Sequence, residues 1–185
     1  DKDIQNKDSF IYHPFSSFTD FKSTLNGLAS IIDQTERDEK IAAFRDSLKN
    51  NKQIPFVFHD SVAFLYFGNA NSVAWAGDFN GWDPYAIDYQ GQKIELSNIW
   101  IVEKKYPIDA RLDYKIVLNS SQWVIDSNNP YTQSGGFGPN SELRMPEWVY
   151  PNETILGSGV NRGQLLSNII INSSSQNLGY AVQYR

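Results

Sequence analysis

The stretch Val73-Ala-Trp-Ala-Gly-Asp-Phe-Asn-Gly-Trp-Asp-Pro84 decides how the rest of the chain is interpreted. Its first five residues favour a strand. The pair Asn80-Gly81 then signals a tight turn, because both residues tolerate positive φ. Pro84 ends further strand pairing, since it has no N–H to donate. We expect the turn to lift Trp82 out of the strand, where its ring can serve as a platform instead of joining the core.

The composition is that of an ordinary globular protein with many aromatic side chains. The chain has 185 residues, of which 41% are hydrophobic, 20% charged and 14% aromatic. This length predicts one domain with room for an appendage. The net charge of −5 disfavours nucleic acid and anionic membranes as partners. The absence of cysteine excludes disulfides, thiol catalysis and cysteine-metal sites. No apolar run approaches the roughly 20 residues of a membrane span.

Between Phe56 and Met145, short apolar runs alternate with turn-forming clusters, which is typical of an antiparallel β-sandwich. The predicted strands are Phe56–Phe58, Val62–Phe67, Val73–Gly77, Ile99–Tyr106, Leu112–Leu118, Gln122–Ile125 and Glu142–Met145. Trp75 and Trp100 lie inside two of them. We therefore expect both indoles to belong to the core.

Residues 18–51 have helical periodicity, and residues 1–17 before them are expected to form an extended arm. The first helix, capped by Ser17 or Thr19, is predicted from apolar residues at spacings of three and four: Phe18, Phe21, Leu25, Leu28 and Ile32. A second helix is predicted to start in a capping-box-like segment, Thr35–Asp38, and to end at Asn50-Asn51. Two short helices cannot bury their apolar faces alone. They should pack together, and against either the β domain or a neighbouring domain.

The composition changes again after Pro151. Residues 152–162 are predicted to be a Gly-rich linker. Strands are predicted at Gly163–Asn172 and Leu178–Arg185, around a turn at Ser173–Asn177. A hairpin of this kind would have unpaired edges. It would be disordered, fold back, or pair with a second copy of the chain.

The turn motif of residues 73–84 resembles the immunoglobulin-like glycogen- and starch-binding modules of carbohydrate-binding family 48. Such modules occur in glycogen-branching and debranching enzymes and in the β subunit of AMP-activated kinase. The resemblance continues in the family's order through Tyr114–Asn119, Trp123 and Gly138–Met145. It implies that residues 55–150 form an immunoglobulin-like antiparallel β-sandwich, with the two-helix arm before it and a truncated hairpin after it.

Three further passages resemble one branch, the modules that precede esterase domains of the enterochelin-esterase and feruloyl-esterase type. These passages are Ala110–Lys115, Asp126–Pro130 and Gly135–Pro146. The resemblance implies that residues 151–185 are a linker and the first strands of an α/β-hydrolase domain. The parent protein would then be a serine esterase, and we expect it to be bacterial and periplasmic or extracellular.

The same resemblance implies a carbohydrate site. In the starch-binding family, two tryptophans, a lysine and an asparagine contact the glucan, and the matching residues here are Trp82, Lys115, Trp123 and Asn140. Exposed indoles stack on the apolar faces of sugar rings at low conformational-entropy cost, and the amide and ammonium bind hydroxyls. Tyr85, Tyr131 and Phe137 lie in predicted loops and could extend this platform.

The sequence offers no catalytic machinery. It contains no G-x-S-x-G motif, and its two histidines, His13 and His59, are far apart. His59-Asp60 is interpreted as a turn pair, because a triad also needs a positioned nucleophile. Gly135–Gly138 is predicted to be a loop that lacks the residues of a phosphate-binding loop. We therefore expect a chain that is not itself an enzyme and that holds no cofactor or metal.

Two roles remain open, together with a third identity for the parent protein. The domain could be structural, with its catalytic domain as partner, or it could bind a polysaccharide or oligosaccharide of the α-glucan or xylan type. The parent could also be a glycogen-branching or debranching enzyme. Convergence of Trp82, Lys115, Trp123 and Asn140 on one exposed face would favour binding. Burial or scattering of these side chains would favour a structural role.

Overall fold

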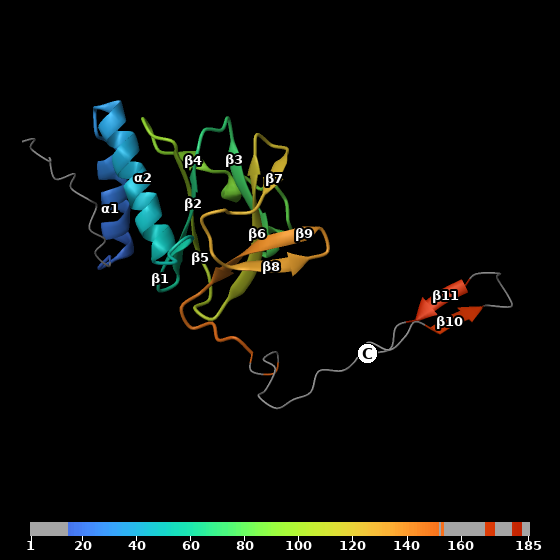
Figure 1. Ribbon diagram of the computed structural model, residues 1–185. Coiled ribbons are helices and arrows are strands. Elements are labelled where there is room, and N and C mark those ends of the chain that lie inside the picture. The colour runs from blue at the N-terminus through green and yellow to red at the C-terminus, as the bar shows by residue number, and fades with distance from the viewer. Residues whose placement is uncertain (1–14, 152, 154–168, 173–178, 183–185) are drawn as a thin grey trace, which may run out of the picture. The chain divides into compact units, whose positions relative to one another are not determined.

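The computed structural model describes residues 15–151, 153, 169–172 and 179–182 (Figure 1). The chain divides into two compact units, residues 1–149 and residues 150–185. The first unit contains two helices and two antiparallel sheets. The predicted fold class is confirmed, because the protein is mainly β and forms a sandwich preceded by a two-helix arm. The helices belong to the same unit as the sandwich.

Sheet A and sheet B form the two layers of the sandwich. Sheet A has the order β1 (Phe56–Phe58), β2 (Ser61–Phe67), β5 (Ile99–Lys105), β4 (Gln92–Lys93). Sheet B has the order β3 (Val73–Gly77), β6 (Arg111–Leu118), β9 (Gly138–Arg144), β8 (Thr132–Gly135), and β7 (Gln122–Val124) also pairs with β6. β6 is therefore the central strand of sheet B. It pairs with β3 on one edge, and with β9 and then β7 on the other.

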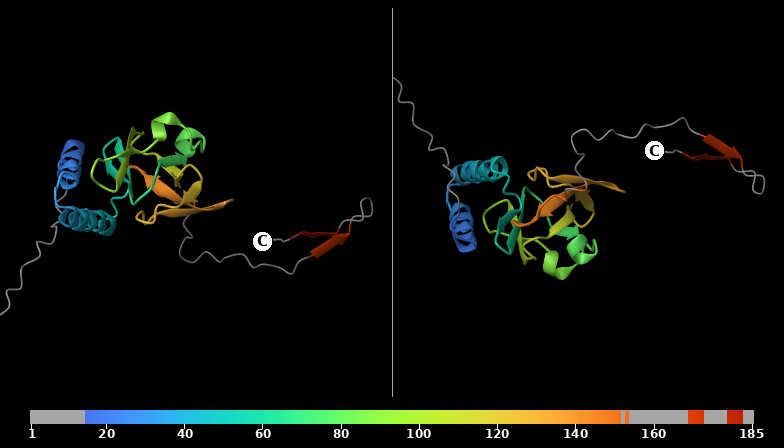
Figure 2. Two further views of the ribbon diagram at one scale, coloured as in Figure 1. Left: turned by 90° about the horizontal axis from the view of Figure 1, so that it is seen from above. Right: turned by 90° about the horizontal axis from the view of Figure 1, so that it is seen from below.

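Sheet A is buried on both faces and so contributes to two hydrophobic cores. Along β2, Ala63 and Leu65 pack toward the helices, whereas Val62 and Phe64 pack toward sheet B. Figures 1 and 2 show the helices on one side of sheet A, away from the β8–β9 hairpin. Two-sided burial explains why β2 is a continuous apolar run in the sequence. Trp75 and Trp100 lie in the core between the sheets, as predicted.

The helices α1 (Phe18–Ala29) and α2 (Gln34–Asn50) begin at side-chain caps. Ser17 caps α1 by accepting the Asp20 N–H, so of the two predicted caps, Ser17 and Thr19, the first is confirmed. Asp33 caps α2, so the second helix begins before the predicted Thr35–Asp38 segment. Ile32 is 95% exposed between the helices and does not extend the apolar face of α1. α1 ends at Ala29, and Asp33, whose carboxylate accepts the Glu36 N–H, begins a separate helix.

Two strands were not predicted, and one predicted loop is part of a hairpin. β8 contains only exposed residues, so it has no apolar alternation that could reveal it. It pairs with β9, and the pairing extends to Gly135 opposite Gly138. The predicted loop Gly135–Gly138 is therefore the tip of the β8–β9 hairpin. β4 has two exposed residues, Gln92 and Lys93, and was missed for the same reason.

The second unit contains one antiparallel pair, β10 (Ile169–Asn172) with β11 (Gly179–Val182). Both strands fall within the spans predicted from the sequence. The first fourteen residues of the predicted arm and most of the predicted linker lie outside the described residues. Neither helix in the described part of the chain is long and apolar enough to cross a membrane.

Candidate ligand-binding site

The turn after β3 is held by one asparagine. Asn80 Oδ1 accepts the Gly77 N–H at 3.0 Å, and its Nδ2 donates to the Trp75 carbonyl at 3.0 Å. Gly81 and Trp82 both adopt the left-handed conformation, with φ of 63° and 61°. The sequence predicted positive φ for the Asn80-Gly81 pair, but the conformation falls one residue later. Asn80 instead acts through its side chain, and this shift brings Trp82 out of the strand direction.

Trp82 is held by one hydrogen bond from its backbone and one from its indole. Its backbone N–H donates to the Gly77 carbonyl at 2.9 Å, and its Nε1 donates to Asp78 Oδ1 at 3.0 Å. Asp78 Oδ2 accepts the Asp113 N–H of β6 at 2.8 Å. A left-handed conformation is uncommon for a bulky residue and needs such support. The ring is therefore fixed relative to the central strand of sheet B.

Six residues line one cleft of about 570 Å³ beside sheet B, namely Trp82, Lys115, Trp123, Gly136, Phe137 and Asn140. They come from the turn after β3, from β6, β7 and β9, and from the β8–β9 tip. Three of the six are aromatic. Trp123 is 43% exposed and Phe137 is 98% exposed, so the cleft opens to solvent.

The structure brings together the four main residues predicted from the sequence, and Phe137 with them. Gly136 also lines the cleft, although the sequence analysis did not assign it to the site. Tyr85 and Tyr131 do not line the cleft. Tyr85 is 72% exposed in the loop after Trp82, and the Tyr131 ring lies 3.9 Å from the Arg144 guanidinium. What the cleft binds stays a prediction.

Lys115 and Asn140 supply the polar side chains of the cleft. Lys115 Nζ donates to the Phe137 carbonyl at 3.2 Å, which ties the β8–β9 tip to β6. Asn140 Nδ2 donates to Asp113 Oδ2 at 3.3 Å. A Cβ at Gly135 would lie 2.9 Å from Asn140 Nδ2, so glycine leaves the space that this amide occupies. Lys115 makes no ion pair with any residue of the described chain and gives the cleft a positive charge.

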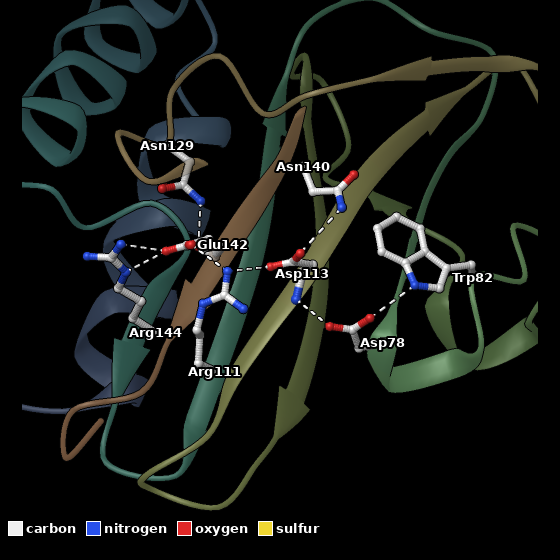
Figure 3. A network of polar contacts seen from close by, with 8 residues as sticks. All are labelled: Asp78, Trp82, Arg111, Asp113, Asn129, Asn140, Glu142 and Arg144. Carbon is white, nitrogen blue, oxygen red and sulfur yellow. Dashed lines mark hydrogen bonds and ion pairs between the residues drawn. The ribbon is translucent and has the colours of Figure 1, made fainter. Parts of the chain in front are cut away.

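A row of charged residues continues from Asp113 along the outer face of sheet B (Figure 3). Arg111 Nη2 lies 2.8 Å from Asp113 Oδ1 and also pairs with Glu142. Arg144 Nε donates to Glu142 Oε2 at 2.6 Å. Burial alone would raise the pKa of Glu142. The hydrogen bonds and charges of the two arginines outweigh it and hold this pKa below its ordinary value.

A second polar network is buried in the sandwich. Tyr114 donates to Asp126 Oδ2 at 2.9 Å, and Asn129 Nδ2 donates to the Tyr114 hydroxyl at 3.1 Å. The Ser141 hydroxyl accepts the Asp126 N–H at 2.8 Å. Burial raises the pKa of Asp126 to about 6, although hydrogen bonds from the Tyr114 hydroxyl and from the backbone of Asn128 and Asn129 oppose the shift. The network locks the segment after β7 onto β6 and β9.

The described residues contain no group of three or more His, Asp or Glu side chains that could hold a metal ion. His59 lies in the turn between β1 and β2, with a φ of 53°. Its neighbour Asp60 pairs with Lys105 at 3.0 Å. The interpretation of His59-Asp60 as a turn pair fits this position.

No model of a known protein family matches the sequence, and neither does any curated protein. Solved structures do match. Ferric enterobactin esterase from Salmonella typhimurium has a TM-score of 0.50 and 13% sequence identity, over 66% of this chain and 40% of that chain. Enterobactin esterase from Shigella flexneri, solved in the presence of enterobactin, has a TM-score of 0.46 and 14% identity, over 66% of this chain and 39% of that chain. This chain thus spans about two fifths of the length of these esterases, and at such identities the likeness to the Salmonella protein is one of fold.

Proposed function

We propose that this chain is a non-catalytic accessory domain of an esterase-like protein, and that its cleft binds a carbohydrate chain. The observation that carries the proposal is the convergence of Trp82, Trp123 and Phe137 around Lys115 and Asn140. Aromatic rings offer flat apolar area to the CH faces of a sugar, and the two polar side chains can bind its hydroxyls. The similarity in fold to part of an esterase supports the accessory role.

The cleft suits binding better than a purely internal structural role because it opens to solvent. A side chain that is 98% exposed, such as Phe137, contributes little to the stability of the domain that carries it. The rings of Trp82 and Trp123 are likewise not fully buried. Asp78 holds the Trp82 indole, and Lys115 of β6 holds the backbone of Phe137, as expected for a preformed site.

Affinity electrophoresis tests this proposal directly. The full chain is run through gels that contain glycogen, starch, xylan or arabinoxylan, beside Trp82→Ala and Trp123→Ala. We expect at least one polymer to retard the wild type, and each substitution to weaken binding by roughly 30-fold, as for a central aromatic contact. Tyr85→Ala is the matched control, because this exposed aromatic lies outside the cleft and its loss should leave migration unchanged.

A second candidate function is supported by the extreme exposure of Phe137 at the hairpin tip. Exposed apolar groups of this kind often become buried when domains meet. The cleft could therefore dock a neighbouring domain of a longer protein. Unretarded migration of the folded wild type in all four gels would contradict carbohydrate binding and favour this docking role.

A further inference from the structure

Two side chains that line the cleft, the Trp82 indole and the Asn140 amide, are linked to the same residue of β6. The Trp82 indole reaches Asp113 through Asp78, and the Asn140 amide reaches it directly (Figure 3). Asp113 itself does not line the cleft. It lies between two residues that do, one on each side of β6.

Beyond the end of β3, the Asp78 side chain accepts the next backbone N–H of β6. The pairing of the two strands ends at Gly77 opposite Tyr114, so the Asp113 N–H lies beyond the last strand pair. The Asp78 carboxylate takes this position with Oδ2, at 2.8 Å, and uses Oδ1 for the Trp82 indole, at 3.0 Å. Both of its oxygens are therefore occupied, and the orientation of the indole is tied to the backbone of β6.

The carboxylate of Asp113 decides which way the Asn140 amide faces. A carboxylate oxygen can only accept, so Asn140 must present its NH₂ group to Asp113 Oδ2, at 3.3 Å. The amide oxygen is then directed away from Asp113, and within the described residues it has no hydrogen-bond partner. Asp113 Oδ1 lies 2.8 Å from Arg111 Nη2 in an ion pair, which favours this orientation of the carboxylate. The cleft thus receives an acceptor from Asn140.

We propose that Asp113 is the positioning residue of the cleft. Its carboxylate orients the Asn140 amide, and its backbone N–H, through Asp78, orients the Trp82 indole. The inference rests on the proposed function only in that the cleft binds a ligand, because the orientation itself can be measured without one.

The first test uses nuclear magnetic resonance on the full chain, with Asp113→Asn and Asp113→Ala. In Asp113→Asn the oxygen should stay with Arg111, so the new NH₂ group faces Asn140 and the Asn140 amide must turn over. Asp113→Ala should leave that amide free. We expect the Asn140 side-chain amide signals to shift in both variants. Asp109→Asn, which makes the same change of charge at an exposed site, should leave them in place.

The orientation of Trp82 must be tested with a different substitution, because the backbone N–H of residue 113 is still present in both Asp113 variants. In Asp78→Ala the indole N–H signal of Trp82 should move and exchange faster with solvent. Asn140 signals that stay in place in both Asp113 variants would overturn the proposal. An indole N–H signal of Trp82 that is unchanged in Asp78→Ala would also overturn it.

A double-mutant cycle then links orientation to binding. The probe is whichever of the four polysaccharides retards the wild type most. Asp113→Ala and Asn140→Ala should each weaken its binding by about tenfold, the value expected for one hydrogen bond with a polar ligand group. Asp113→Ala should add nothing in the Asn140→Ala background, because Asp113 acts through that amide. Losses that multiply would overturn the proposal. Absence of binding to every polymer would contradict the proposed function alone, and the resonance data would still decide the role of Asp113.

Discussion

β3 approaches β6 closely at Gly77. A Cβ there would lie 2.3 Å from the Asp113 carbonyl oxygen and 2.9 Å from Tyr114 Cβ. We expect Gly77→Ala to lower the free energy of unfolding by about 1–3 kcal/mol, because backbone must shift to admit the methyl group. Urea denaturation measures the change.

Gly27→Ala is the matched control for Gly77→Ala. Gly27 lies in α1, and apart from the adjoining residues and backbone of that helix no atom lies within 4 Å of a Cβ placed there. Alanine should raise the stability of this helix by up to about 1 kcal/mol. If Gly77→Ala were as stable as the wild type, β3 and β6 could move apart at this point without lowering the free energy of unfolding.

At the same scale, the sequence predicted the types of residue in the cleft better than their conformations. Trp82, Lys115, Trp123 and Asn140 were found through motifs that keep their order along the chain. The left-handed conformation of Trp82 could not be predicted, because it is supported by hydrogen bonds that the Asn80 and Asp78 side chains accept in the folded turn. The buried Asp126 network was missed as well, since Asp126 and Asn129 follow the last residue of a predicted strand and carry no apolar pattern that would signal burial.

Among the elements, those that bury a face were predicted and those that bury nothing were missed. β2 and β5 have apolar side chains on both faces, so their runs are unmistakable. β8 forms because it pairs with β9, and its own side chains are all exposed. The sequence contains no periodic signal for such a strand. The packing side of the helices was also left open, and the structure places it on sheet A.

The helical layer should contribute strongly to the stability of the sandwich. Phe44 of α2 is fully buried beside Phe21, with ring centroids 6.1 Å apart. We expect Phe44→Ala to lower the free energy of unfolding by about 3–5 kcal/mol. Ile32→Ala, at a 95% exposed position, should change it by less than about 0.5 kcal/mol. Similar small effects of both substitutions would show that the helices are not part of the cooperative unit.

For the molecule as a whole, Asp126 and Glu142 give the stability opposite pH dependences. The pKa of Asp126 in the folded chain is about 6, above its ordinary value of 3.8, so folding favours the protonated form. Its stabilising effect is complete below about pH 4 and is lost as the pH rises through 6. The loss amounts to about 3 kcal/mol. The pKa of Glu142 is lowered, so its contribution is present above its ordinary value of 4.5 and is lost at more acidic pH.

Chemical denaturation between pH 4.5 and pH 7 can separate these effects. Relative to the wild type, Asp126→Asn should show a flatter decline of stability over this range, because the residue no longer titrates. Asp88→Asn, at an exposed position, serves as the control and should follow the wild-type curve. A parallel curve for Asp126→Asn would contradict a raised pKa for the buried carboxyl.

The three rings of the cleft come from segments far apart in the sequence, and only the folded sheet holds them together. The unfolded chain therefore has no cleft, and a ligand can bind the folded state alone. Binding and folding are then linked by mass action. A ligand at a hundred times its dissociation constant adds about 2.7 kcal/mol to the stability. The rise in melting temperature that each candidate ligand causes would thus rank the ligands, with Trp82→Ala as the control that should show no rise.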